Sequence, residues 1–302
     1  MVPNETIKVK VPATTANMGP GFDCLGMALE LYNEIHMRLA PGKISIQIEG
    51  EGAEDIKRDE NNIVWRAAQR VFQEVGFNNP GLWIRLINQI PTSRGLGSSA
   101  AAIVGGLVAA NQLIGGKLTQ DRLLALATEL EGHPDNVAPA LLGGVVISVL
   151  AEGEVHYLKI MPPEGLNTVV AIPDFKLSTH AARDVLPQKV SLKDAIFNLS
   201  RVALLVGALC EKRLDLLYIA GQDTLHQPYR SSLVPGMQEV IQAASQAGAL
   251  NVTLSGAGPT VLALTNSGSE EIARSMGQAF ENAGTSCQIK LLRPAVEGTK
   301  IL

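Results

Sequence analysis

The stretch from residue 82 to residue 113 constrains the fold most, because it joins three local structures in a fixed order. Residues 82–90 form an apolar, strand-like run, and the small residues of 100–113 predict a helix. Between them, Gly95 and Gly97 allow the backbone to bend and to approach a ligand closely. The sequence therefore predicts a strand, a glycine loop and a helix start.

This order is typical of an anion-binding site. Ser98 and Ser99 fall at the helix start, where the first N–H groups lack intrahelical partners and the helix dipole favours negative charge. We favour a phosphate site here, and the alternative is a serine-capped helix after a glycine turn. A Walker A loop is not indicated, because serines rather than a lysine follow the second glycine.

The composition indicates a folded protein with a sizeable core. With 302 residues the chain is long enough for two domains, and 46% hydrophobic and 18% charged residues predict a sizeable core. The net charge of −4 is spread along the chain and aromatic residues make up only 4%, so nucleic-acid binding has little support.

Other classes of protein find little support as well. Three scattered cysteines cannot form a disulfide scaffold, and the five histidines show no metal-ligand spacing. No signal peptide is visible, and polar and glycine residues interrupt the longest apolar helix candidate, 100–114. We therefore expect no membrane partner and a cytoplasmic location.

Periodicity divides the chain into two halves. The first half mixes strands and helices, with a helix capped by Asn61 or Asn62, and the second half follows the order β-α-β-β-α-β of a ferredoxin-like fold. The polar turn at Glu152 and Gly153 predicts the boundary. The expected domains are residues 1–152 and 153–302.

Three further segments carry polar residues among small ones. Residues 11–26 contain Asn17 and Asp23, residues 131–139 begin with Glu131, and residues 254–261 form a glycine turn between two strands. Each has a plain structural alternative: a surface loop, a solvated helix end, and a hairpin without a ligand.

Together the four segments resemble the GHMP kinase superfamily, in particular its homoserine kinase branch. The resemblance rests on Asn17-Met-Gly-Pro-Gly-Phe-Asp23, the loop ending Gly-Leu-Gly-Ser-Ser-Ala-Ala, His133-Pro-Asp-Asn136 and Ser-Gly-Ala-Gly-Pro-Thr, and extends over the whole chain. It implies an α+β fold of two domains, with an N-terminal ATP-binding domain like domain 2 of ribosomal protein S5 and a ferredoxin-like C-terminal domain.

The resemblance also implies ATP and Mg²⁺ as cofactors. Ser98 and Glu131 match the positions that hold Mg²⁺ in the family, with Glu129 as the alternative carboxylate. The ATP phosphates would be wrapped by the residues of the loop: Pro91, Thr92, Ser93, Arg94, Gly95, Leu96, Gly97, Ser98, Ser99, Ala100 and Ala101.

The implied substrate is L-homoserine, a small molecule with a carboxylate, an ammonium group and a hydroxyl. Arg183 and Arg230 match the carboxylate-binding arginines of the family, since a guanidinium binds a carboxylate through two hydrogen bonds. The other substrate-binding matches are Asn17, Asp23, His133 and Thr179.

The resemblance implies O-phospho-L-homoserine as product, in threonine biosynthesis. Asn136 stands where mevalonate kinase-like relatives carry an aspartate, and an amide cannot act as a general base. We therefore expect direct attack of the hydroxyl on the γ-phosphate, with Asn136 as the catalytic residue. Two alternatives stay open, a shikimate- or mevalonate-type kinase and a non-catalytic sensor. Homodimers are common in the family, so a homodimer is one option.

Overall fold

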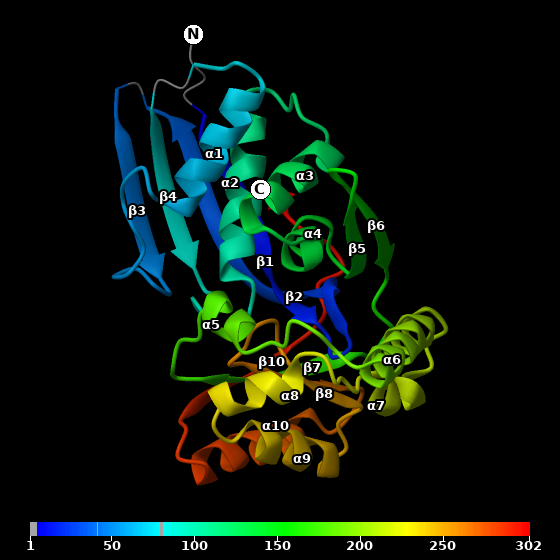
Figure 1. Cartoon of the computed structure of the whole chain (residues 1–302). Coiled ribbons are helices and arrows are strands. Elements are labelled where there is room, and N and C mark those ends of the chain that lie inside the picture. Colours follow the sequence, from blue (N-terminus) through cyan, green and yellow to red (C-terminus); the bar gives the residue numbers. More distant parts are fainter. Residues whose placement is uncertain (1–4, 41, 79–80) are drawn as a thin grey trace.

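The computed structural model describes residues 5–40, 42–78 and 81–302, which form two β-sheets with helices packed on them (Figure 1). The larger sheet has seven strands, ordered β11-β1-β2-β4-β3, and β5 pairs with both β2 and β6. Its strands are β1 (Ile7–Asn17), β2 (Gly21–Leu39), β3 (Ile44–Gly50), β4 (Leu82–Asn88), β5 (Val145–Ala151), β6 (Glu154–Ile160) and β11 (Lys300–Ile301).

Four helices accompany this sheet: α1 (Ile63–Glu74), α2 (Ser98–Leu113), α3 (Gln120–Glu131) and α4 (Pro134–Leu142). Asn62 caps α1 as predicted, because its side-chain oxygen accepts hydrogen bonds from the N–H groups of Val64 and Trp65. Most of α2 is buried, as its small residues allow, and it packs between α1 and the sheet. The predicted strand, loop and helix at 82–113 are confirmed.

The segment 11–26 is a buried hairpin, so the alternative of an ordinary surface loop is wrong. β1 and β2 pair antiparallel, and the turn between them is confined to residues 18–20. Asn17, Met18 and Gly19 take positive φ angles at this turn. Only glycine fits at position 26, because a Cβ there would lie 1.8 Å from the carbonyl oxygen of Asp135.

The turn at Glu152 and Gly153 joins β5 to β6, and both strands belong to the larger sheet. The chain reaches the smaller sheet only after residue 160, through residues 161–166. A polar turn between two strands is a feature of hairpins as well as of domain boundaries, so the sequence pattern did not distinguish them.

The smaller sheet has the predicted ferredoxin-like arrangement. Its antiparallel strands are ordered β10-β7-β9-β8, and they are β7 (Asn167–Pro173), β8 (Asn251–Leu254), β9 (Val261–Thr265) and β10 (Cys287–Leu292). Along β7, Val169 and Ala171 join the core under α9 (Met237–Gln246) and α10 (Ser269–Asn282), whereas Val170 and Ile172 join the larger core. This sheet is therefore covered on both faces.

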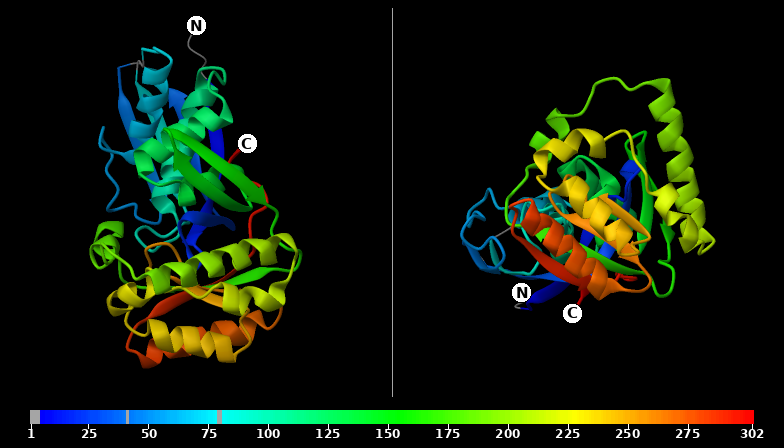
Figure 2. Two further views of the ribbon diagram at one scale, coloured as in Figure 1. Left: turned by 45° about the vertical axis from the view of Figure 1, so that its right-hand side comes forward. Right: turned by 90° about the horizontal axis from the view of Figure 1, so that it is seen from below.

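Between β7 and β8 the chain forms several helices, and Figure 2 shows the longest of them, α6, at the periphery of the molecule. They are α5 (Thr179–Asp184), α6 (Leu192–Cys210), α7 (Leu217–Ala220) and α8 (Gln227–Arg230), with short 3₁₀ turns at Leu214–Leu216 and Ser231–Leu233. The last residues return to the larger sheet, where Ile301 pairs with Val9. Within the described residues, every helix is too short or too polar to cross a membrane.

Candidate active site

The glycine loop lies between the two sheets and packs on the C-terminal glycine turn. The Ser255 hydroxyl donates a hydrogen bond to the carbonyl oxygen of Gly95 at 2.6 Å. A Cβ at position 95 would lie 2.3 Å from the carbonyl oxygen of Ser255. Glycine is therefore required here by close approach as well as by its φ of 77°. The contact brings the first and fourth of the predicted segments together.

The helix that follows the loop begins without a side-chain cap. Its N-cap is Gly97, in the left-handed conformation, and among the residues that the structure describes no side chain caps the first turn. The alternative of a serine-capped helix is therefore wrong. The N–H groups of the first turn have no intrahelical partner, and an anion above them would be stabilised by both hydrogen bonds and the helix dipole.

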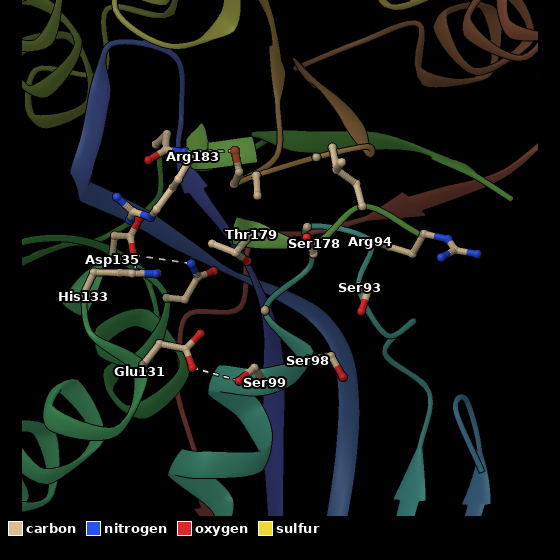
Figure 3. Close-up of a pocket in the computed structure, with 18 of the residues that line it drawn as sticks. Ser93, Arg94, Ser98, Ser99, Glu131, His133, Asp135, Ser178, Thr179 and Arg183 are labelled. Carbon is tan, nitrogen blue, oxygen red and sulfur yellow. Dashed lines mark hydrogen bonds and ion pairs between the residues drawn. The ribbon is translucent and has the colours of Figure 1, made fainter. Parts of the chain in front are cut away.

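A cavity of about 240 Å³ lies in front of this helix start (Figure 3). It is lined by all four segments and by the region around α5 and α8. The lining residues used below are Asn17, Asp23, Ser98, Ser99, Glu131, His133, Asp135, Asn136, Thr179, Arg183 and Arg230. The structure therefore gathers at one site every predicted substrate-binding, catalytic and metal-binding residue.

Asp23 and Arg183 form a two-point ion pair on one wall of the cavity. Arg183 Nη1 and Nη2 lie 3.0 and 2.7 Å from the two carboxylate oxygens of Asp23. This hydrogen bond is the main cause that raises the pKa of Arg183. Asn17 holds the backbone of Asp23 through its side-chain oxygen and Gly256 through its Nδ2, so its own polar atoms are engaged by the protein.

Arg230 is a buried cation, with only 2% of its surface exposed. Its guanidinium donates to the carbonyl oxygens of Ala182 and Gly256 and to Nδ1 of His226. Burial, followed by the nearby charge of Arg183, lowers the pKa of Arg230 to about 10, which leaves it protonated at neutral pH. The cavity thus has two cationic groups beside the carboxylate of Asp23.

His226 and Phe22 hold these arginines in place. Nε2 of His226 lies 2.7 Å from the carbonyl oxygen of Gly19, so the Nε2–H tautomer leaves Nδ1 free to accept from Arg230. The Phe22 ring stacks on His226, and the guanidinium groups of Arg183 and Arg230 lie 5.6 and 5.3 Å from its centroid.

His133, Asp135 and Asn136 form a hydrogen-bonded chain at the start of α4. Nδ1 of His133 bonds to Oδ1 of the buried Asp135 carboxylate, which also accepts from Nδ2 of Asn136 at 3.4 Å. Burial alone would lower the pKa of His133, but the hydrogen bond and charge of Asp135 outweigh it and raise the pKa. Ligand atoms of Asp23, His133 and Asp135 lie within 4.8 Å of one another, although each group already has a protein partner.

Glu131 faces the helix start. Its Oε2 accepts a hydrogen bond from the Ser99 hydroxyl at 2.8 Å, whereas Ser98 points away from Glu131 (Figure 3). Burial raises the pKa of Glu131, and the bond from Ser99 offsets part of this shift. A carboxylate and a hydroxyl beside an anion site are the hard oxygen ligands that suit Mg²⁺. The fallback, Glu129, instead forms ion pairs with Arg70 and Arg122.

A second cavity, of about 280 Å³, opens on the other side of the loop. It shares Ser93, Ser98 and Ser99 with the first cavity, and apolar side chains such as Ile56 and Val64 line it. The loop therefore lies between a mainly apolar pocket and a strongly charged one. Such a pair of pockets suits a molecule with an apolar ring at one end and phosphates at the other.

Part of the predicted loop lies behind the cavities. Neither cavity is lined by Pro91, Leu96, Ala100 or Ala101, and all four of these side chains are buried.

Three site residues were not predicted from the sequence: Asp135, His226 and Phe22. Asp135 and Phe22 stand inside the quoted motifs, so the motifs themselves carried the signal for them. For His226 the spacing of four residues to Arg230 was the only signal.

Comparisons with known proteins identify the family. The family "GHMP kinases N terminal domain" matches residues 62–144, and "GHMP kinases C terminal" matches 205–282. The homoserine kinase of Carboxydothermus hydrogenoformans is 50% identical over 290 residues, which are 96% of this chain and 95% of that protein. That of Moorella thermoacetica is 50% identical over 294 residues, covering 97% and 99%.

A solved structure is similar over the whole chain. The crystal structure of homoserine kinase from Cytophaga hutchinsonii has a TM-score of 0.90 and 33% identity, and the match covers 100% of this chain and 99% of that one. The predicted two-domain α+β fold and the resemblance to the superfamily are both confirmed. The chain belongs to the homoserine kinase family, within the GHMP kinase superfamily.

Proposed function

We propose that the protein transfers the γ-phosphoryl group of ATP to the hydroxyl of L-homoserine and releases O-phospho-L-homoserine. The observation that carries this proposal is the charge pattern of the first cavity. Asp23 and Asp135 are anionic, and Arg183 and Arg230 are cationic, within one pocket beside an uncapped helix start. Family membership agrees with it, since the relatives that match nearly the whole chain are homoserine kinases.

The charge pattern is complementary to an amino acid. The guanidinium groups of Arg183 and Arg230 would bind the α-carboxylate, and Asp23 would accept from the α-ammonium group. Asp23 and Arg183 satisfy one another before substrate enters, so binding exchanges one internal ion pair for two pairs with the substrate. His133 and Thr179 would then lie against the side chain of homoserine.

The nucleotide would span the glycine loop. Its base and ribose fit the more apolar second cavity, and its phosphates would lie against the N–H groups at the start of α2. The loop can bind phosphates without a lysine in this arrangement, because the helix N-terminus itself supplies the positive potential.

A Mg²⁺ ion would be held by Glu131 together with a serine hydroxyl. The sequence favoured Ser98, but Ser99 is the serine that contacts Glu131, and we propose Ser99 as its partner. Bound there, Mg²⁺ would neutralise negative charge on the phosphate oxygens during transfer.

The chain contributes positioning and hydrogen bonds rather than a general base. Asn136 has an amide, which cannot accept the proton of the attacking hydroxyl. Its Nδ2 can donate to the transferring phosphoryl group, and a loose transition state needs little help in deprotonating the nucleophile. The proton would leave late, and the phosphate itself is a suitable acceptor.

The test is a coupled assay of ADP release with homoserine, threonine, shikimate and mevalonate as separate acceptors. The proposal predicts turnover with homoserine well above that with each of the others. Turnover with shikimate or mevalonate above that with homoserine would indicate another kinase of the superfamily. The absence of ADP release with all four acceptors would indicate a nucleotide-binding sensor.

A further inference from the structure

Thr14 lies behind the proposed catalytic amide and is completely buried. Its hydroxyl donates a hydrogen bond to Oδ1 of Asn136 at 2.8 Å, across 122 positions of sequence. Its backbone N–H donates to the carbonyl oxygen of Leu96 at 3.1 Å, so the same residue also touches the glycine loop. A Cβ at position 97 would lie 1.9 Å from the Thr14 hydroxyl oxygen, which shows how closely Gly97 packs on it.

The amide of Asn136 can face the cavity in two ways, and its neighbours select one of them. In the observed orientation Oδ1 accepts from Thr14, and Nδ2 lies 3.4 Å from the carboxylate oxygen Oδ1 of Asp135. Turned over, the amide would place its oxygen against that carboxylate oxygen, and two acceptors would then face each other. Asp135 therefore selects the orientation in which Nδ2 is the group available to the cavity, and Thr14 holds that orientation by donating to Oδ1.

We propose that Thr14 is a positioning residue for phosphoryl transfer. It fixes Asn136 as a hydrogen-bond donor toward the transferring group, and it ties that donor to the loop that holds the phosphates. The inference rests on the proposed function, because it assigns Thr14 a role through Asn136. Thr14 itself does not line the cavity, so its role would be exerted through Asn136.

The direct test is a double-mutant cycle with Thr14→Val and Asn136→Ala. Valine keeps the shape of threonine but cannot donate, so Oδ1 of Asn136 loses the hydrogen bond that holds the amide in place. Thr14→Val should lower kcat about tenfold, the size of effect that one lost hydrogen bond produces. The KM values for homoserine and ATP should change less than twofold, and Thr14→Ser should restore kcat.

In the Asn136→Ala background, Thr14→Val should change kcat less than twofold, because the group it positions is absent. A tenfold loss in that background would overturn the inference and leave the proposed function intact. Wild-type kcat in Asn136→Ala would refute the catalytic role of Asn136 and this inference with it.

Thr128→Val is the matched control, since Thr128 is also buried and its hydroxyl donates to the carbonyl oxygen of Leu124, inside α3. It should keep wild-type kcat, and a tenfold loss in this control would overturn the inference. If Thr14→Val does not fold, Thr14→Ala replaces it in the double-mutant cycle. A loss of kcat only when Asn136 is present would support the inference, and an equal loss in the Asn136→Ala background would overturn it.

Discussion

Arg183→Lys is the sharpest test of substrate recognition. Arg183 reaches both oxygens of a carboxylate through two nitrogens, at 3.0 and 2.7 Å in its pair with Asp23. A carboxylate of homoserine has the same two oxygens, and a lysine ammonium cannot copy this two-point contact although it keeps the charge. The substitution therefore removes one charge-assisted hydrogen bond from the bound substrate.

The expected size of the effect follows from exposure. A hydrogen bond to a charged group contributes about 1.5–3 kcal/mol, and the value is lower where solvent screens it. The side chains of Arg183 and Asp23 are 38% and 35% exposed, so we take the lower end. About 1.5 kcal/mol corresponds to a rise of about tenfold in the KM for homoserine.

The assay is coupled ADP release, with homoserine varied at saturating ATP and then ATP varied at saturating homoserine. Only the homoserine KM should rise, with the ATP KM and kcat changing less than about twofold. Arg201→Lys, at a half-buried position of α6 that does not line the cavity, serves as the control and should behave as wild type. Equal rises in both KM values, or an unchanged homoserine KM, would refute the assignment of Arg183 to the carboxylate.

Three further predictions concern Glu131, Asn136 and His133. Glu131→Gln should lower kcat by about 10²–10³, partly restored by high Mg²⁺, and near-normal activity at low Mg²⁺ would exclude it as a ligand. Asn136→Asp should not accelerate single turnovers, and a faster enzyme with a new acid limb in its pH profile would contradict the base-free mechanism. Because its folded pKa is raised above 6.5, protonated His133 stabilises the fold below that pH, and this contribution is lost as pH rises through the folded pKa. Thermal unfolding should therefore show wild type losing more stability than His133→Gln between pH 6 and pH 8, and equal losses would contradict this.

Local patterns in the sequence were sufficient for much of the fold. The strand pattern at 82–90 and the small residues of α2 each predict one element from local sequence, and both elements are confirmed. The predicted order of strands and helices in the second half is confirmed as well. The hairpin at 11–26 was not predictable in this way, because its glycines and Asn17 are typical of turns wherever they stand. These residues form strands through the antiparallel pairing of β1 with β2, and Gly26 packs closely against the backbone of Asp135.

The site shows the same division. Residue types and motifs predicted most of the side chains that line the cavity. Which of these side chains contact one another depends on the fold. The Asp23–Arg183 ion pair joins residues 160 positions apart, and the bond between Ser99 and Glu131 depends on how α2 faces α3. No spacing in the sequence distinguishes Ser99 from Ser98 as the partner of Glu131.

The most direct test of phosphoryl transfer to homoserine is identification of the phosphorylated product. The enzyme is incubated with ATP, Mg²⁺ and L-homoserine, and the products are resolved by ³¹P NMR. We predict a phosphate monoester on the homoserine hydroxyl, formed in equal amount to ADP. Free phosphate with unmodified homoserine, or no consumption of ATP, would contradict it.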